Sequence, residues 1–551
     1  MRSQPCVALL AQQIVRRLRL VRRLPVAALA ACALCALPAR AYNERVHALL
    51  TSRALAARPA WNAEVLKPPG PKDLAALRGL FWRTAGQLSD TALRTWFLAR
   101  FPTEESLDAW AFKELFLLDP AASVHGFDPT EDEARPLPRG ELLARASRWP
   151  DDDARNRHRY LRDARRQIVR GPGGQPLPDD PATLAMGSLT TVTSQAHAHY
   201  GLLPPPLSDD PEVLKKDPRH FAVPADVQTF GADFAQLYTD LALLAADPAL
   251  PAHPWLSATF AGAAFHHVED LANQIHTVQV GIFEFFEAAW LQSKVRDLVT
   301  LGGLFGRRRT LPELGLRLVA NHHLLSEDLF ARRLADAAEG RAAAPEVRAG
   351  LFGIADDDRA FAAAVEAAVA QSQGAFGRGI AQAMIEVSSN EGPEIYRLAW
   401  QLSAPALHDG AGHEYDDKAD APDDWLAKDT PARAARLARF YTVAGKGLQR
   451  SGTALRLWQA QFDAAARDLS PAARAAAVQR TLAFLFSYDR ARAERRAAFQ
   501  PAVPAQERVD YRWAAGALSV ALALGLGVRA AVRRRLRAAS AEESDGAPLP
   551  N

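Results

Sequence analysis

Histidines and carboxylates gather in one short segment, FHHVEDLANQIHTVQ, which runs from Phe265 to Gln279. At helical spacing, His266 and Asp270 lie four residues apart on one face, where an imidazole and a carboxylate can bind the same cation. His276 follows His266 by ten residues, which is not a whole number of turns, so we expect it to point toward a second ion or to follow a break in the helix. One cation is therefore not enough to account for this segment.

A second segment repeats the arrangement. The stretch ANHHLLSEDLF, from Ala320 to Phe330, places His323 and Glu327 four residues apart on one helix face. Two helices that each present a histidine and a carboxylate at this spacing are far less common by chance than one. Together, the two segments predict a metal centre to which more than one helix contributes.

Two earlier stretches add further nitrogen and oxygen ligands. YNERVH, from Tyr42 to His47, places a histidine about one and a half turns from the expected mature N-terminus. SRWPDDDARNRHRY holds three consecutive aspartates ahead of His158, and these are Asp151, Asp152 and Asp153. Hard and borderline ligands of this kind are suited to zinc.

The composition of the chain predicts the elements that must position these residues. Ala, Leu and Arg are abundant, bulky strand formers are few, and apolar residues recur at spacings of three and four, so we expect an all-helical protein. Its 551 residues allow about two to four domains. The net charge is only +3 and the basic residues concentrate at both ends, which argues against binding to duplex nucleic acid.

The N-terminal residues 1–41 have the pattern of a secretory signal peptide. An arginine-rich start and an apolar run precede the small-x-small ending Ala39-Arg40-Ala41, so cleavage is expected before Tyr42. The alternative is a lipoprotein signal with its lipid on Cys32. All the cysteines of the chain lie in this segment, namely Cys6, Cys32 and Cys35. A chain that begins at Tyr42 therefore has no thiolate to offer a metal.

The other end of the chain carries a second membrane signal. Residues 513–532 contain the apolar run WAAGALSVALALGLGV and precede a cluster of arginines, which predicts a single transmembrane helix with residues 533–551 in the cytoplasm. A buried helix with a basic tail is the alternative. Residues 501–512 are expected to be a linker. The expected protein is thus an exported domain on the periplasmic or extracellular face of a membrane.

Stretches rich in Pro, Gly and Asp separate the helical windows between these ends. The expected helices are Asn43–Ala57, Leu184–Leu202, Val227–Ala246, Trp255–Val280, Leu311–Glu339, Asp357–Ser388, Pro431–Ala465 and Pro471–Phe499. The last two suggest a hairpin within a helical extension, residues 341–500, which follows a histidine-bearing domain of residues 42–340. The sequence indicates no oligomeric state.

The motifs H-x-x-x-D-x-x-x-x-x-H and N-x-H-x-x-x-E resemble those of the zinc-dependent phospholipase C and single-strand nuclease superfamily, all-helical enzymes with three zinc ions in one cleft. The matching residues are His266, Asp270 and His276 for the first motif and Asn321, His323 and Glu327 for the second. In that family the mature chain begins with an aromatic residue, usually Trp, and Tyr42 fits this position. The resemblance covers residues 42–339 and is carried by short motifs.

The resemblance implies three zinc ions and a set of ligands for each. The first would be held by Asp151, His158, His266 and Asp270, the second by His276, His323 and Glu327, and the third by His47 with the amino and carbonyl groups of Tyr42. Asp270 would bridge two ions if it lies centrally. We take Asp151 rather than Asp152 or Asp153 because Trp149-Pro150-Asp151 matches the family's W-x-D motif.

One histidine of this set departs from the family pattern. His158 follows Asp151 by only seven residues, whereas about fifteen are usual in the family. His199, in AHAHYGL, keeps a His-Tyr pair but lies much further along the chain, and we prefer His158. His267 and His322 stand next to expected ligands and should point roughly 100° away from them, either supporting the ligands from outside or in structural roles.

The activity that the resemblance implies is hydrolysis of a phosphodiester. Hydroxide held by zinc would attack phosphorus, and Asp151 would orient or deprotonate it. Glu327 instead of Asp, the expected membrane anchor and the lack of a basic, aromatic-lined groove favour a phospholipid substrate. The alternatives are a single-strand nuclease or phosphatase of the same fold, and a non-catalytic binding module that metal stabilises.

Overall fold

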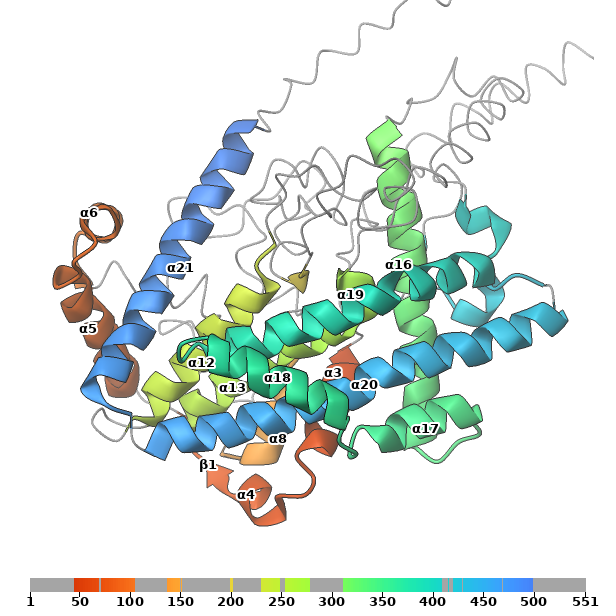
Figure 1. The fold of residues 1–551 in the computed structure, drawn as a ribbon, viewed down its shortest axis with the longest axis horizontal. Coiled ribbons are helices and arrows are strands. Elements are labelled where there is room, and N and C mark those ends of the chain that lie inside the picture. Colours follow the sequence, from red (N-terminus) through yellow and green to blue (C-terminus); the bar gives the residue numbers. More distant parts are fainter. Residues whose placement is uncertain are drawn as a thin grey trace, which may run out of the picture. The chain divides into compact units, whose positions relative to one another are not determined.

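Helices make up most of the part of the chain that the computed structural model describes (Figure 1). That part comprises residues 44–68, 71–104, 136–148, 150, 199–201, 229–247, 253–277, 311–408, 415, 420–428, 430–467 and 469–498. All of these residues belong to one compact unit. Within them, the strands β1 (Val65–Leu66) and β2 (Leu137–Pro138) form one short antiparallel pair. The expected all-helical fold is therefore confirmed for the described residues.

The helices fall into three stretches of the chain. The first stretch contains α3 (Glu44–Ala54), α4 (Pro59–Ala63), α5 (Pro71–Gly86), α6 (Thr91–Arg100) and α8 (Arg139–Ala146). The second contains α12 (Gly231–Ala246), α13 (Pro254–Ala272) and the 3-10 turn η6 (Gln274–Thr277). The third contains α16 (Leu311–Ala338), α17 (Pro345–Gly353), α18 (Arg359–Gln371), α19 (Phe376–Leu402), α20 (Thr430–Arg467), α21 (Pro471–Ala498) and the 3-10 turns η7 (Pro405–His408) and η8 (Pro422–Trp425).

Helix α13 is buried along almost its whole length. Every residue from Trp255 to Ala272 is inaccessible to solvent or nearly so, as expected for a helix that is apolar on most of its circumference. It begins with Pro254 in its first turn, where the missing N–H leaves no hydrogen bond unmade. Its neighbours include α12, α8, α19, α20 and α3. The polar residues of α13 are thus held in the interior of the protein.

A glycine permits the close approach of α13 to α8. A Cβ atom at Gly262 would lie 2.5 Å from the Cβ of Ala146 and 2.8 Å from the carbonyl oxygen of Leu143. No side chain fits at these distances, so the contact requires glycine. The close approach brings the end of α8, including the backbone of Ser147, to the face of α13 that carries His266.

The C-terminal helices pack directly on the histidine-bearing part. Both α19 and α20 contact α12 and α13, and α20 also contacts α3. Trp458 of α20 donates a hydrogen bond from Nε1 to Thr239 Oγ1 at 2.8 Å, and its ring meets that of Phe265 edge-on at 4.9 Å. Residues 341–500, expected as an extension, therefore share a hydrophobic core with the preceding domain wherever the structure describes them.

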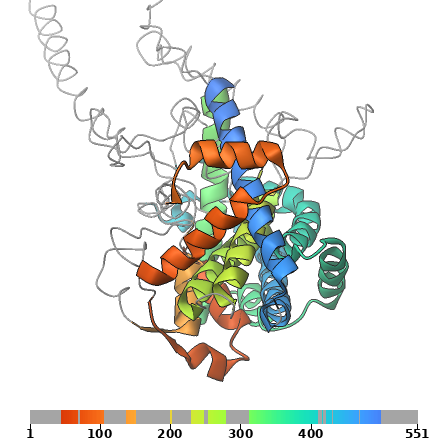
Figure 2. The same ribbon diagram turned by 90° about the vertical axis from the view of Figure 1, so that its left-hand side faces the viewer.

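Helices α5 and α6 lie against α21, where Figure 2 shows them beside the blue C-terminal helix. The ring of Trp96 in α6 meets Phe486 of α21 edge-on at 5.3 Å. Arg480, also on α21, forms a bidentate ion pair with the buried carboxylate of Asp240 on α12, at 2.6 and 3.0 Å. The last helix is thus joined to both the first and the second stretch of helices.

Two of the expected helices end earlier than their patterns indicated. The helix expected at Trp255–Val280 stops at Ala272, and η6 follows it. The helix expected at Asp357–Ser388 is divided into α18 and α19 by a turn in which Gly374 has a φ of 87°. Glycine adopts this left-handed conformation readily because it has no Cβ atom, so the turn ends α18.

No helix in the described ranges has the length and apolar character needed to cross a membrane. The expected transmembrane helix, residues 513–532, lies outside the described residues. The same holds for the signal peptide at 1–41, the linker at 501–512 and the tail at 533–551. These four assignments stay predictions.

The contact between α20 and the end of α13 can be tested at Gly447. An added Cβ atom there would lie 2.5 Å from the backbone oxygen of Ala272, so we expect Gly447→Ala to destabilise the protein by about 1–3 kcal/mol. Chemical denaturation of the purified protein measures this change. Gly353→Ala is the matched control, because its nearest atom would be 3.7 Å away. Equal stability of the two variants would refute the contact.

Candidate metal centre

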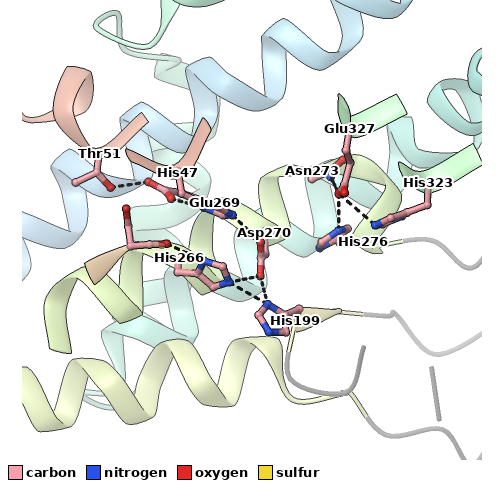
Figure 3. Close-up of polar contacts among 11 residues, drawn as sticks. His47, Thr51, His199, His266, Glu269, Asp270, Asn273, His276, His323 and Glu327 are labelled. Atoms are coloured by element: carbon pink, nitrogen blue, oxygen red, sulfur yellow. Dashed lines mark hydrogen bonds and ion pairs between the residues drawn. The ribbon is translucent and has the colours of Figure 1, made fainter. Parts of the chain in front are cut away.

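Two buried groups of side chains could each hold a metal ion, and Figure 3 labels all of their residues except His267. The first group consists of His199, His266, His267 and Asp270, and the second consists of His276, His323 and Glu327. Within each group, one potential ligand atom from every residue lies within 4.8 Å of all the others. Nitrogen and carboxylate oxygen are the donors in both.

The first group is built on α13. His266 and Asp270 stand one turn apart, with His266 Nε2 at 3.0 Å from Asp270 Oδ2. His199 comes from a distant part of the chain, and its Nδ1 lies 2.6 Å from the same oxygen. His266 Nδ1 lies 2.8 Å from the carbonyl oxygen of Ser147, which can only accept a hydrogen bond. Nδ1 must therefore carry a proton, and the Nε2 lone pair of neutral His266 faces the group.

Asp270 also faces a histidine on its other side. Its Oδ1 lies 3.4 Å from Nε2 of His47, which belongs to α3. No residue in the described ranges donates a hydrogen bond to this oxygen, although it is fully buried. Asp270 thus lies between His47 and the pair formed by His199 and His266 (Figure 3). This is the central position that a bridging carboxylate requires.

A second carboxylate, that of Glu269, contacts His47 at the ring nitrogen that does not face Asp270. Glu269 Oε2 accepts a hydrogen bond from His47 Nδ1 at 2.7 Å, and its Oε1 accepts one from Thr51 Oγ1 at 2.8 Å. His47 and Thr51 are one turn apart on α3, so both contact the same carboxylate. Sequence reasoning missed these two roles, because nothing local to Glu269 or Thr51 indicates that α3 packs on α13.

The second group joins η6 to α16. His323 and Glu327 stand one turn apart on α16, with His323 Nε2 at 3.2 Å from Glu327 Oε1. His276 Nε2 lies 3.2 Å from the same oxygen, and Asn273 donates a hydrogen bond to it at 2.8 Å. The helix break after Ala272 therefore turns His276 away from His266 and toward a separate group. The expectation that His276 leaves the first face is confirmed.

Tyr200 links the two groups. It follows His199 in the chain, and its ring stacks on that of His276 with the centroids 4.6 Å apart. Its hydroxyl group lies 3.4 Å from His323 Nδ1. Burial, with the nearby charges of Glu327 and Asp270, raises the pKa of the Tyr200 phenol well above its usual value, so it stays protonated at neutral pH. The sequence indicated only that His199 and Tyr200 are adjacent.

Burial dominates the electrostatics of both groups. It raises the pKa of Glu269 and of Asp270 well above the usual carboxyl value, because a buried anion has lost its hydration. It lowers the pKa of His276 to about 4 for the corresponding reason. Burial alone would also raise the pKa of Glu327. His323 and His276 outweigh this effect through their charges and hydrogen bonds, so the pKa of Glu327 lies below its usual value. A bound cation would stabilise all the ionised carboxylates.

The spacing of the donor atoms fits zinc at two places. Ligands bound at about 2.0–2.1 Å in a tetrahedron lie about 3.3–3.4 Å from one another. His47 Nε2 and Asp270 Oδ1 are 3.4 Å apart, and Glu327 Oε1 lies 3.2 Å from both of its histidines. Asp270 Oδ2 lies 2.6 Å from His199 and 3.0 Å from His266, which are hydrogen-bond distances. Both distances would have to lengthen by a few tenths of an ångström or more for these atoms to bind one zinc ion.

The structure brings together most of the residues expected at the site. Those present are His47, His266, Asp270, His276, His323 and Glu327. Those outside the described residues are Tyr42, Asp151, Asp152, Asp153 and His158. His199, which was the alternative to His158, lies against His266 and Asp270, and the prediction of His158 stays untested. The distance in sequence between His199 and the other ligands had counted against it, but the fold places His199 next to them in space.

The two histidines expected in structural roles behave differently. His322 turns away from its neighbouring ligand and stacks on Trp400 at 4.5 Å, as expected. His267 was also expected to turn away, but one of its ring nitrogens falls within the first group. Its ring is stacked against Phe234 at 5.2 Å and Tyr238 at 5.6 Å. Aromatic packing thus fixes the ring of His267 beside the ligands.

Comparison with known proteins identifies no relative. No protein-family model, no curated protein and no solved structure matches this chain. The resemblance to the zinc-dependent phospholipases and nucleases therefore stays a prediction from the sequence motifs alone.

Metal content provides a direct test of the two groups. We expect His266→Ala and His323→Ala each to reduce the metal bound per chain by about one equivalent, and the double variant by about two, because each removes a ligand from a different group. Mass spectrometry of the purified proteins for metals measures this. His322→Ala is the matched control, being a buried histidine beside a ligand, and should keep all its metal. Equal metal content in all the variants would refute the assignment.

The pH dependence of binding follows from the raised pKa of Asp270. A metal ion binds the ionised form of Asp270, whereas the metal-free folded protein keeps Asp270 protonated up to a higher pH. Metal binding should therefore release protons, and the affinity for metal should increase as the pH rises. By the same shift, the metal-free protein should lose stability as pH rises through the folded pKa, because the folded state binds more protons than the unfolded state. Calorimetric titration in two buffers of different ionisation enthalpy counts the protons. Binding without proton release would contradict this expectation.

Proposed function

We propose that this protein is a zinc-dependent phosphodiester hydrolase of the phospholipase C type. The observation that carries the proposal is the central place of Asp270, with His47 on one of its oxygens and His199 and His266 on the other. A second group of ligands lies close by, joined to the first through Tyr200. Neighbouring cation sites that share a carboxylate suit the displacement of an oxygen at phosphorus.

Each group of residues has a distinct part in this proposal. His199, His266 and Asp270 would hold one zinc, and His276, His323 and Glu327 a second. His47 and Asp270 would hold a third, together with Tyr42, which lies outside the described residues. When bound, zinc supplies an acidified water and stabilises charge on phosphoryl oxygens. Asp151, also outside the described residues, would orient or deprotonate the attacking water.

The chain's own residues contribute orientation and the state of protonation. Ser147 holds His266, and Glu269 holds His47, so that in both histidines Nε2 faces Asp270. His276 is neutral above a pKa of about 4 and therefore presents a lone pair at neutral pH. Tyr200 keeps its proton and can donate a hydrogen bond to an anionic oxygen held between the two groups.

A phospholipid is the substrate class that we propose first. Glu327 rather than Asp and the expected C-terminal anchor support it, since an anchored enzyme acts next to lipid. A single-strand nuclease or phosphatase of the same fold is the alternative within catalysis. A non-catalytic, metal-stabilised module is favoured by one observation, which is that each ligand within the described residues is at most 6% exposed. Structural zinc sites are closed in this way, whereas catalytic sites keep an open position.

A substrate screen separates these possibilities. We expect the zinc-loaded protein to cleave phosphatidylcholine vesicles and to lose more than about 100-fold in kcat/KM in the His266→Ala variant, since removal of even an outer-shell partner typically costs 10–100-fold. Single-stranded DNA and a phosphomonoester are the other substrates of the screen. His322→Ala serves as the control and should retain activity.

The outcomes of the screen discriminate among the candidates. Cleavage of DNA or of the monoester alone would replace the phospholipid with that substrate. Full zinc loading with no hydrolysis of any of these substrates would refute the proposed enzymatic function and favour the binding module.

A further inference from the structure

Glu269 is a buried carboxylate whose two oxygens are both occupied by one helix. His47 donates to Oε2 at 2.7 Å, and Thr51 donates to Oε1 at 2.8 Å. All three residues are at most 1% exposed. Glu269 stands next to Asp270 in the sequence but faces α3, so the two neighbouring carboxylates approach His47 from opposite sides (Figure 3).

The hydrogen bond to Glu269 determines which nitrogen of His47 carries the proton. Ionised Glu269 can only accept, so in that state Nδ1 is protonated and the lone pair of the neutral ring is at Nε2. Nε2 lies 3.4 Å from Asp270 Oδ1, an oxygen that receives no hydrogen bond from the described residues. A lone pair and a carboxylate oxygen at this separation repel unless a cation lies between them, and the separation fits two ligands of one tetrahedral zinc.

From this geometry we propose that Glu269 is a positioning residue for a metal ion shared by His47 and Asp270, with Thr51 holding the carboxylate in place. The inference rests on the proposed function, because it assumes that the site binds zinc. It deepens that function by assigning the outer partners of one ion. A histidine ligand that donates its second nitrogen to a carboxylate is oriented and made more basic.

A purely structural role explains the arrangement less well. Removing a carboxylate from water is unfavourable unless its oxygens are fully paired, and apolar side chains would join α3 to α13 without that penalty. What a carboxylate adds is direction, since it fixes both the tautomer and the angle of the His47 ring. Thr51 completes the pairing of the second oxygen, so that Glu269 has a single orientation.

The test compares zinc affinity and the state of His47 in variants of the full chain. We expect Glu269→Gln to weaken one zinc about 10–100-fold in competition with a chelator, leaving the other ions unchanged. Nitrogen-15 NMR of His47 should change from a single Nδ1–H tautomer in the zinc-free wild type to a mixture. Thr51→Val keeps the shape of the side chain and should weaken the same ion by a smaller factor.

Asp328→Asn is the matched control. Asp328 is another buried carboxylate next to a ligand, but its partners are the Tyr415 hydroxyl at 2.7 Å and Arg332 at 2.9 Å, which lie outside both groups. This variant should lower the unfolding temperature without altering zinc affinity or the His47 spectrum. It therefore measures the effect of removing a buried charge alone.

The outcomes separate this inference from the proposed function. Unchanged zinc affinity and an unchanged His47 tautomer in Glu269→Gln would overturn the positioning role and leave the enzyme proposal standing. A wild-type protein that binds no zinc would overturn both. If Glu269→Gln does not fold, Thr51→Val becomes the test of the inference. A zinc affinity of Thr51→Val equal to that of the wild type would then refute the positioning role of Glu269.

Discussion

The burial of Asp270 near the end of a largely apolar helix is the constraint on which the site depends. An ionised carboxylate in the interior must be compensated, and burial raises the pKa of Asp270 accordingly. Among the described residues, its ion-pair partners are imidazoles on both sides and not arginine or lysine. Neutral imidazoles do not cancel its charge, whereas a cation held by the same atoms does. This is why a metal ion explains the centre better than an ion-pair network.

The end of α13 is the second feature that shapes the site. The helix stops at Ala272, two residues after Asp270, and η6 then carries His276 toward α16. The turn is held from the C-terminal side, because Gln274 donates a hydrogen bond to the carbonyl oxygen of Val443 at 2.9 Å and Gly447 leaves room for the backbone of Ala272. Helix α20 therefore supports the separation of the two groups, although it provides no ligand to either.

The ligands differ in how they are oriented. His266 is fixed by a backbone carbonyl group, His47 by a carboxylate, and His267 by flanking aromatic rings. These partners are the backbone just after α8, a side chain of α13 itself and two aromatic rings of α12. Orientation by rigid neighbours keeps the donor atoms in place before a metal arrives, which reduces the reorganisation that binding requires.

The sequence by itself determined what depends on local spacing. An interval of four residues places His266 with Asp270, and His323 with Glu327, on any helix, and the interval to His276 takes it off that face. Only the tertiary structure decided that His199 completes the first group and that Glu269 supports His47, because these contacts join residues 71 and 222 positions apart. Helical periodicity states which face a side chain occupies but not which distant helix packs against it. The partners that Asp270 has in His47 and His199 were therefore decided by the packing of α3 and of residues 199–201 against α13.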